Sequence, residues 1–290
     1  MEEKVPRISV VIPCLNGAAD IPDQLLALAA QTWSGWWEVV VADNGSTDGS
    51  ADVAMEFADR LPRVRVVDAS QRLGQAHALN VGVGLSAGDA ICLLDADDQA
   101  APGYLTAMAG ALEHHDLIAA SYDSETLNDD DAVRIRGTPQ RDHLLNAYGF
   151  LPYAGSGGLG FRRAAFERIG GFDERMPWLF DVDFCWRARD RGFPVAFVPE
   201  AVVRIRFRGD RSAVYRQARN WASVEPLLYR RYRSVGMPRS SLRAAAKGWA
   251  RAVLRLPELR DPERDAHYLR LLGQRVGRLQ GSLQQRVVFL

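Results

Sequence analysis

Residues 95–98, Asp-Ala-Asp-Asp, place three carboxylates within four positions, directly after the apolar run ICLL. Carboxylates this close repel one another unless solvent or a cation offsets their charge. Carboxylate oxygens suit Mg²⁺ or Mn²⁺, which bind one or two of them together with substrate phosphates and water. A helix-capping turn would use the same residues. The spacing therefore leaves a metal site and a structural turn both open.

Further polar side chains lie at the ends of predicted strands. Apolar, mostly β-branched segments occur at 7–13, 37–43, 64–69 and 90–96, and helical patterns separate them. This rhythm predicts right-handed βαβ units and a mostly parallel sheet, an α/β fold. Ligands on such sheets bind beyond the carboxyl ends of the strands. We therefore expect one crevice to collect the residues at these ends, which are Asn16, Asp43, Asp48, Arg72 and Asp95 to Asp98.

The helix expected after the first strand places Ile21, Leu25, Leu28 and Ala29 on one face. Beyond residue 134 the rhythm changes. A glycine-rich stretch at 155–160, a helix at 181–191 and a strand at 194–198 are expected to complete the same domain. From residue 211 onward the segments are helical and basic, with breaks expected at the proline positions 226, 238 and 257.

Composition is that of a globular protein: the 290 residues are 47% hydrophobic and 25% charged. Three widely spaced cysteines flanked by apolar residues predict reduced core thiols, not disulfides. The histidines have no zinc-binding spacing. The sequence has no apolar run long enough to span a bilayer, and its first residues lack a secretory signal. A cytoplasmic location is the expectation.

The net charge of zero conceals a strong asymmetry. Residues 86–133 contain eleven acidic residues and no Lys or Arg, whereas residues 201–260 contain fifteen basic and three acidic residues. The basic block could pair with phosphates, with the anionic inner face of a membrane, or with nucleic acid. Nucleic acid is not expected, because no recognisable motif of interleaved aromatic platforms is present. Around Trp221, apolar and basic residues alternate as on an interfacial helix, although packing within the protein would give the same pattern.

Four segments in order carry a resemblance to the family 2 glycosyltransferases. They are ISVVIPCLNG from residue 8, EVVVADNGSTDGS from residue 38, LGQAHALNVGVGLSAGDAICLLDADD from residue 73, and GGFDE with DVDFCWRARDRGF and VPEA up to about residue 203. The resemblance implies a GT-A fold and transfer of a sugar from a UDP, GDP or dTDP sugar to an acceptor hydroxyl, with inversion. It also implies a catalytic domain at 1–210, with a nucleotide-sugar half to about residue 100 and an acceptor half at 101–210. A helical, basic extension at 211–290 would follow.

The resemblance also implies roles for particular residues. Pro13, Leu15, Asn16 and Asp43 would contact the base and ribose, and Arg72 the nucleotide sugar. Asp95 and Asp97 match an Asp-x-Asp motif, with Asp95 near the ribose and Asp97 a ligand of Mg²⁺ or Mn²⁺. Asp98 stands beside them as a helper. Asp181 would be the general base, and Gly157, Gly158 and Trp178 fall where acceptor loops lie.

The sequence departs from the family pattern at two points. The Glu of a Glu-Asp pair is replaced by Phe180, and the histidine that often follows the VPEA strand is absent. Arg204 or Arg206 could neutralise the diphosphate instead, because guanidinium binds phosphate in a bidentate manner. Solvated arginines on a strand would look the same. These departures also motivate an alternative, a nucleotide-sugar-binding scaffold that has lost its activity.

Overall fold

A computed structural model describes residues 6–146, 148–207, 211–260 and 265–290. The opening residues MEEKV and the domain boundary expected at residue 210 lie outside these ranges. The chain divides into two compact units. The first comprises Met1–Leu127, Thr138–Leu145 and Pro152–Arg206, and the second comprises Asn128–Gly137, Asn146–Leu151 and Phe207–Leu290. Two short segments from the expected acceptor half thus belong to the second unit.

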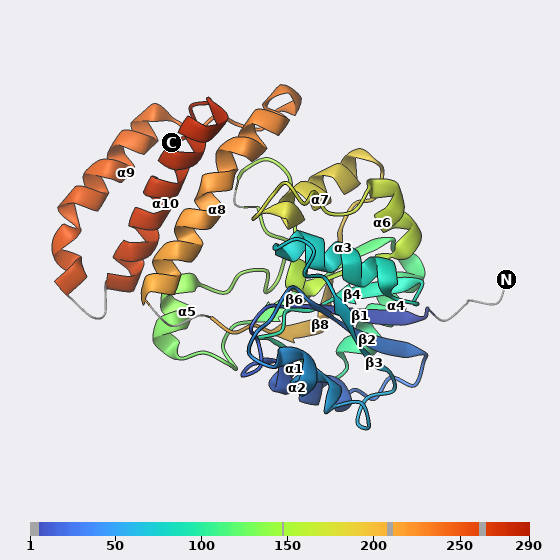
Figure 1. Cartoon of the computed structure of the whole chain (residues 1–290). Coiled ribbons are helices and arrows are strands. Elements are labelled where there is room, and N and C mark those ends of the chain that lie inside the picture. The colour runs from blue at the N-terminus through green and yellow to red at the C-terminus, as the bar shows by residue number, and fades with distance from the viewer. Residues whose placement is uncertain (1–5, 147, 208–210, 261–264) are drawn as a thin grey trace. The chain divides into compact units, whose positions relative to one another are not determined.

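Parallel strands form the first half of the sheet, as the sequence predicts (Figure 1). β1 (Ile8–Cys14) pairs with β2 (Trp37–Asp43) on one side and β4 (Ala90–Leu93) on the other, and β2 pairs with β3 (Val64–Asp68). The helices α1 (Ile21–Ala29), α2 (Ser50–Met55) and α3 (Gln75–Leu85) connect them. Both faces of β1 and β2 are buried, which explains their continuous apolar sequences.

The second half of the sheet mixes strand directions. The eight-stranded order is β3-β2-β1-β4-β7-β6-β8-β5. β7 (Leu159–Arg162) runs antiparallel to β4 and to β6 (Leu117–Asp123), and β6 is parallel to β8 (Ala196–Arg204). The short β5 (Gln99–Ala100) closes the edge against β8. Helices α4 (Tyr104–His114), α6 (Arg163–Ile169) and α7 (Phe180–Asp190) and the 3₁₀ turn η1 (Ser156–Gly158) complete this half.

β8 differs from the predicted strand at 194–198. It begins at Ala196 and continues to Arg204, past Pro199, and a register shift against β6 lies between Ala120 and Ser121. An irregularity of this kind accommodates a residue that cannot donate to the ladder, so the strand continues beyond the proline.

The buried face of α1 includes a polar residue that the predicted apolar face did not contain. Ile21, Leu25 and Leu28 are buried as expected, but Ala29 is exposed and Gln24 is fully buried. The Gln24 side chain donates to the carbonyl of Asp95 at 3.1 Å and accepts from the amide of Ala100 at 2.9 Å. It therefore satisfies backbone groups on both sides of the acidic loop, which is why a glutamine occupies this position.

An aromatic cluster packs beneath α7. Phe172 lies 4.7 Å from Phe184 and 5.3 Å from Phe180, measured between ring centroids, and Phe161 stacks on Phe166 at 4.7 Å. Phe180, which stands where the resemblance implies Glu, is buried in this cluster. Phe180 thus extends the hydrophobic core, and aromatic pairs at these separations stabilise the packing of α7 within the first unit.

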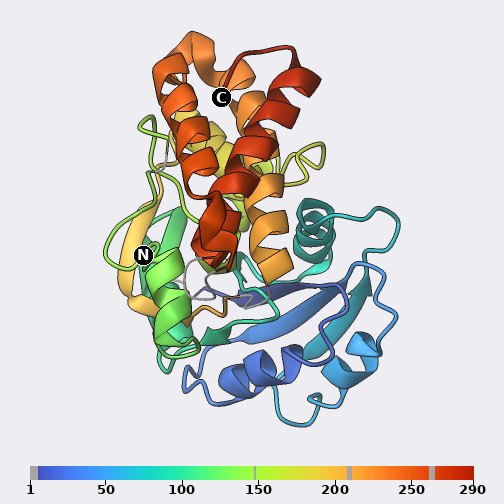
Figure 2. The ribbon, with the colours of Figure 1, turned by 90° about the vertical axis from the view of Figure 1, so that its left-hand side faces the viewer.

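The second unit is helical. It contains α5 (Asp130–Arg136), α8 (Arg211–Tyr232), η2 (Arg233–Val235), α9 (Leu242–Leu254), η3 (Leu256–Arg260) and α10 (Asp265–Gln285). Within it α10 lies between α8 and α9 (Figures 1 and 2). Gly273, Gly277 and Gly281 let α10 approach the α8 backbone. A Cβ on Gly277 would lie 2.2 Å from the carbonyl oxygen of Arg219.

This packing corrects one expectation and qualifies another. Pro226 does not break α8, which continues to Tyr232, because the proline is buried against α10 beside Gly281. Of the apolar residues around Trp221, for which an interfacial and a packing role were both open, Leu228 is fully buried, whereas Trp221 is 46% exposed. Much of the apolar face of α8 therefore serves packing inside this unit.

The three cysteines, Cys14, Cys92 and Cys185, are buried free thiols, as predicted. None of the helices in the described part of the chain has the length and apolar character needed to cross a bilayer.

Candidate functional site

The loops that follow β1 and β2 are joined by hydrogen bonds. The amide of Asn16 donates to Ser46 Oγ at 3.0 Å, and Asn16 Oδ1 accepts from the amide of Thr47 at 2.9 Å. Asp43 Oδ1 caps the same turn by accepting from the amide of Ser46 at 3.0 Å. Asn16 has a left-handed φ of 53°, and the preceding Leu15 is exposed. Asn16 and Asp43 thus lie together beyond the carboxyl ends of β1 and β2, on a surface that we call the ledge.

Asn44 fixes the third loop to this ledge. Its buried amide donates to the carbonyls of Ala69 and Arg72 and accepts from the amide of Gly74. The side chain of Arg72 points elsewhere, because its guanidinium donates to the carbonyl of Glu174 at 2.9 Å and pairs with the Glu174 carboxylate at 3.4 Å. The expected contact of Arg72 with the nucleotide sugar would compete with this pairing.

The carboxylates of the acidic loop have different surroundings. Asp95 Oδ1 accepts from Gln75 Nε2, at the start of α3, at 2.8 Å. Asp98 is buried and accepts from the backbone amide of Arg206 at 2.8 Å, whereas Asp97 remains partly exposed. Burial, together with the neighbouring Asp95 and Asp97, raises the pKa of Asp98 well above its ordinary value. Burial and the two neighbouring carboxylates thus disfavour the charged form of Asp98.

This donor set suits a cation that shares its ligands with a substrate. Among the described residues, no group of three or more His, Cys, Asp or Glu side chains forms a metal site made of protein alone. Mg²⁺ and Mn²⁺ need fewer protein ligands when phosphate oxygens and water complete the shell. The acidic loop could supply these few protein ligands, because its carboxylates lie close together and Asp97 is partly exposed.

The turn η1 brings the acidic loop and α7 together. A Cβ on Gly157 would lie 2.7 Å from Asp95 Oδ2, so only glycine allows this close approach. The adjacent amide of Ser156 donates to Asp181 Oδ2 at 3.2 Å. Neighbouring residues of one turn thus contact Asp95 and Asp181, which places the two carboxylates on the same side of the sheet.

Asp181 lies in the first turn of α7, where Leu179, with a left-handed φ of 57°, begins the helix. Its other oxygen accepts from the amide of Val182 at 2.9 Å, and the side chain keeps part of its surface exposed. Asp183 points away and pairs with Arg187 at 2.7 Å, as the helical spacing predicts. Burial raises the pKa of Asp181 to about 6, despite the two amide donors, which lower it. A carboxyl with this pKa can accept a proton near neutral pH.

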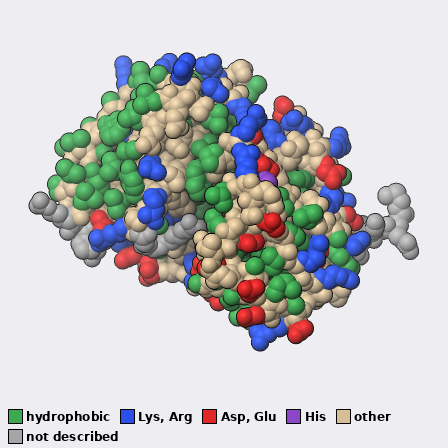
Figure 3. All heavy atoms as spheres, viewed as in Figure 1, with side chains coloured by type: hydrophobic (Ala, Val, Ile, Leu, Met, Phe, Trp, Pro, Cys, Tyr) green, Lys and Arg blue, Asp and Glu red, His purple; other side chains and the backbone are tan. Residues whose placement is uncertain are grey.

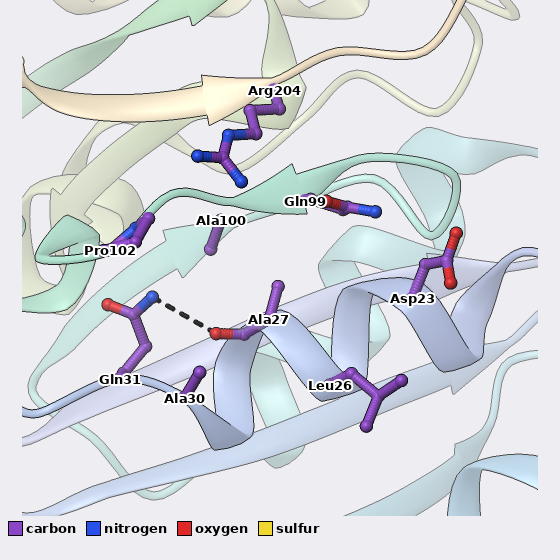
Figure 4. Close-up of a pocket in the computed structure, with 9 residues that line it drawn as sticks. All are labelled: Asp23, Leu26, Ala27, Ala30, Gln31, Gln99, Ala100, Pro102 and Arg204. Atoms are coloured by element: carbon purple, nitrogen blue, oxygen red, sulfur yellow. Dashed lines mark hydrogen bonds between the residues drawn. The ribbon is translucent and has the colours of Figure 1, made fainter. Parts of the chain in front are cut away.

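The two candidate arginines of the β8 region occupy different places. Arg206 Nε donates to the carbonyl of Asp97 at 3.2 Å, and its NH2 group pairs with Asp23 at 2.8 Å. Arg204 instead enters a cavity of about 290 Å³ between α1 and β5, lined also by Gln31 and Ala100 (Figure 4). Only Arg206 contacts the acidic loop directly.

The three candidate acceptor residues lie in two places. Gly157 and Gly158 are buried in η1, and a Cβ on Gly158 would lie 2.7 Å from the Tyr122 ring. Trp178 is half-buried in the segment that leads into α7. The glycines therefore act first as packing positions between Asp95 and Tyr122, whereas Trp178 keeps exposed surface.

Comparison with known proteins decides the family. The sequence profile described as glycosyl transferase family 2 matches residues 9–170, more than half of the chain. The chain belongs to this family. A PGL/p-HBAD biosynthesis glycosyltransferase of Mycobacterium bovis is 32% identical over 183 residues, covering 62% of this chain and 68% of that protein. The glycosyltransferase AglE of Haloferax volcanii is 25% identical over 205 residues, covering 70% and 67%.

Solved structures show that this family 2 glycosyltransferase has the GT-A fold. The mannosyltransferase PcManGT of Pyrobaculum calidifontis, in complex with GDP-Man and Mn²⁺, has a TM-score of 0.61 at 21% identity, covering 94% of this chain and 87% of that chain. TarS 1–349 of S. aureus, in complex with UDP-GlcNAc, has a TM-score of 0.56 at 17% identity, covering 98% and 93%. The expected fold and enzyme class are confirmed.

Three residues beside the site of this glycosyltransferase are not predicted from the sequence. Gln75 holds Asp95, and Glu174 accepts from Asn80 at 2.9 Å and contacts His77 at 3.0 Å, in addition to Arg72. Tyr122 is buried, and its pKa is raised well above its usual value by burial and by Asp95, Asp98 and Asp181. The GGFDE segment contains Glu174, but nothing in the sequence signals which partners it meets.

Proposed function

We propose that this glycosyltransferase moves a sugar from a nucleoside-diphosphate sugar to an acceptor hydroxyl with inversion, and that Asp181 is the general base. The observation that carries the proposal is the turn η1, whose adjacent residues contact Asp95 and Asp181. A donor held at the acidic loop would then present its anomeric carbon toward Asp181. The donor complexes of PcManGT and TarS support a donor of the GDP or UDP type.

The donor side is assigned to the ledge beyond β1 and β2. Pro13, Leu15, Asn16 and Asp43 receive the base and ribose, because exposed and turn-capping groups converge there. The acidic loop lies next to them, since a Cβ on Gly17 would be 3.7 Å from the Cβ of Ala96. Asp95, held by Gln75, is assigned to the ribose. Arg72 reaches the nucleotide sugar only if it releases Glu174.

Asp97 is assigned as the residue that would hold Mg²⁺ or Mn²⁺, and such an ion would stabilise the charge developing on the diphosphate leaving group. Mn²⁺ is present in the PcManGT complex. Arg206, fixed by Asp23 and the Asp97 carbonyl, is the better placed of the two arginines to offset the same charge. Arg204, in its cavity beside α1, would need to move.

Asp181 accepts the proton of the acceptor hydroxyl as the oxygen attacks the anomeric carbon from the face opposite the diphosphate. The Ser156 amide holds the carboxylate in place, and partial burial keeps its pKa near neutrality. Trp178, half-buried ahead of α7, offers an apolar face to the acceptor sugar or aglycone. Gly157 and Gly158 are assigned to the acceptor side, where their lack of a side chain lets η1 pack against Asp95 and Tyr122 next to Asp181.

The test is to incubate the protein with UDP-, GDP- and dTDP-sugars, with and without Mn²⁺, and a panel of hydroxyl acceptors. We expect transfer from one nucleotide class, and proton NMR should show that an α-linked donor gives a β-linked product. Retention of configuration would contradict the role of Asp181. Donor binding by calorimetry without transfer to any acceptor would favour the inactive scaffold.

A further inference from the structure

Helix α9 presents three distinct faces. Its buried face consists of the small residues Ala245, Gly248 and Ala252. A Cβ on Gly248 would lie 2.4 Å from the guanidinium of Arg275 in α10, so this stripe is the one that packs within the helical unit. The stripe covers a narrow part of the circumference, since the residues are three and four apart. Most of α9 therefore remains available to solvent or to a partner.

The second face is an exposed apolar stripe. Leu242, Ala246, Trp249 and Val253 follow one another at spacings of four, three and four, which aligns them along one side of the helix. Leu242 is 56% exposed and Val253 is 70% exposed, whereas Trp249 is half-buried, and the apolar character continues into η3 at Leu256 and Leu259. Figure 3 shows hydrophobic side chains gathered over the part of the surface where α9 and α10 lie. An exposed apolar surface of this extent marks an interaction site.

The third face is basic. Arg243, Lys247, Arg251 and Arg255 recur every four residues, and α9 contains no acidic residue. At 3.6 residues per turn, Arg243 lies about 90° and Lys247 about 130° round the helix from the middle of the apolar stripe, and Arg251 lies almost opposite it. Arg255 contacts Glu258 of η3 at 3.6 Å, and the side chains of Arg243, Lys247 and Arg251 are exposed. The same helix thus carries an exposed apolar side and, beginning on its flank at Arg243, a cationic side.

We propose that α9 and η3 bind the surface of an anionic lipid bilayer. The apolar stripe enters the boundary between headgroups and acyl chains, and Arg243 and Lys247 contact the headgroup phosphates. A bilayer offers both features at once, an apolar interior beneath a negative surface, and the combination of the two signals is what gives stable peripheral attachment.

Charge disfavours a second copy of the chain as the occupant. In a twofold symmetric contact each subunit contributes the same patch, so the basic flank of one α9, with Arg243 and Lys247, would face that of the other. Like charges brought together in this way repel. The residues of this surface all belong to the helical unit, and none of them has an assigned catalytic role.

The experiment is sedimentation of the full chain with vesicles at low ionic strength. Mixed phosphatidylcholine–phosphatidylglycerol vesicles should bind the protein, and vesicles of phosphatidylcholine alone should bind it much less. The double variant Arg243→Gln/Lys247→Gln should lose roughly thirtyfold in affinity, from about 1 kcal/mol per cation near an anionic surface. The double variant Leu242→Asn/Val253→Asn should lose at least about tenfold through the lost apolar contact.

Matched controls come from the sheet unit. Leu85→Asn removes a leucine that is 53% exposed, and Arg60→Gln/Arg63→Gln removes two exposed arginines. Both should bind vesicles as the wild type does, and circular dichroism should show unchanged helicity in the α9 variants. Failure of the wild type to bind anionic vesicles would overturn the proposal, as would equal binding by the α9 variants. A wild-type dimer that the Leu242→Asn/Val253→Asn variant dissociates, without vesicle binding, would assign the stripe to self-association and also overturn it.

Discussion

Replacing Asp181 with asparagine is expected to lower kcat/KM about 10²- to 10⁴-fold, the usual contribution of a positioned general base. Asparagine has nearly the same shape, and its carbonyl oxygen can still accept from the Ser156 amide, so the geometry of η1 should persist. Affinity for the nucleoside diphosphate, measured by calorimetry, should stay close to that of the wild type. The variant therefore separates chemistry from donor binding.

Asp190→Asn is the matched control for this variant. Asp190 is the exposed last residue of the same helix, so the substitution removes one carboxylate from α7 without touching the site. Its activity should equal that of the wild type. Normal turnover by the Asp181→Asn protein would remove Asp181 from the mechanism, and equal losses in both variants would indicate a general electrostatic effect of α7.

Replacing Asp97 with alanine is expected to abolish the stimulation of donor binding and transfer by Mn²⁺. The ion stabilises the leaving group by several kcal/mol, so a loss of about a thousandfold in kcat/KM is expected. In the absence of metal the variant and the wild type should bind the nucleotide with similar affinity. Titration of Mn²⁺ at fixed donor concentration, followed by transfer rate, measures the difference.

Asp59→Ala serves as the control for the metal experiment. Asp59 is exposed and lies after α2, in the segment before β3, where it contacts none of the acidic-loop residues in the described structure. The transfer rate of the Asp59→Ala protein should respond to added Mn²⁺ as that of the wild type does. If the Asp97→Ala protein retains the full Mn²⁺ response, the metal ligand is another group, and the assignment of the Asp-x-Asp motif to this role fails.

Local pattern was sufficient to predict the parallel half of the fold. Strands such as β1 and β2 are buried on both faces, and their continuous β-branched sequences carry that information directly. The register shift in β8 and the continuation of α8 through Pro226 were not predictable, because both depend on a neighbouring element. Pro226 is accommodated by α10, a helix about 40 to 60 residues later in the chain.

The candidate site was predictable in its residue types and less so in its contacts. Asp95 and Asp181 could be named from the sequence, but their link through η1 depends on Gly157 and Ser156, which a glycine-rich stretch only hints at. The pairing of Arg72 with Glu174 joins residues 102 positions apart, and no local rule specifies such a partner. The burial of Phe180 among four other phenylalanines likewise shows only in three dimensions.

The pH dependence of kcat/KM tests the proposed base most directly. Asp181 must be deprotonated to accept a proton, and burial raises its pKa to about 6. The rate should therefore fall about tenfold for each unit of pH below that value, and the residual activity of Asp181→Asn should lack this acidic limb. A wild-type profile that stays flat until the ordinary range of an exposed aspartate, or an acidic limb that persists unchanged in the Asp181→Asn protein, would contradict the assignment of Asp181 as the catalytic base.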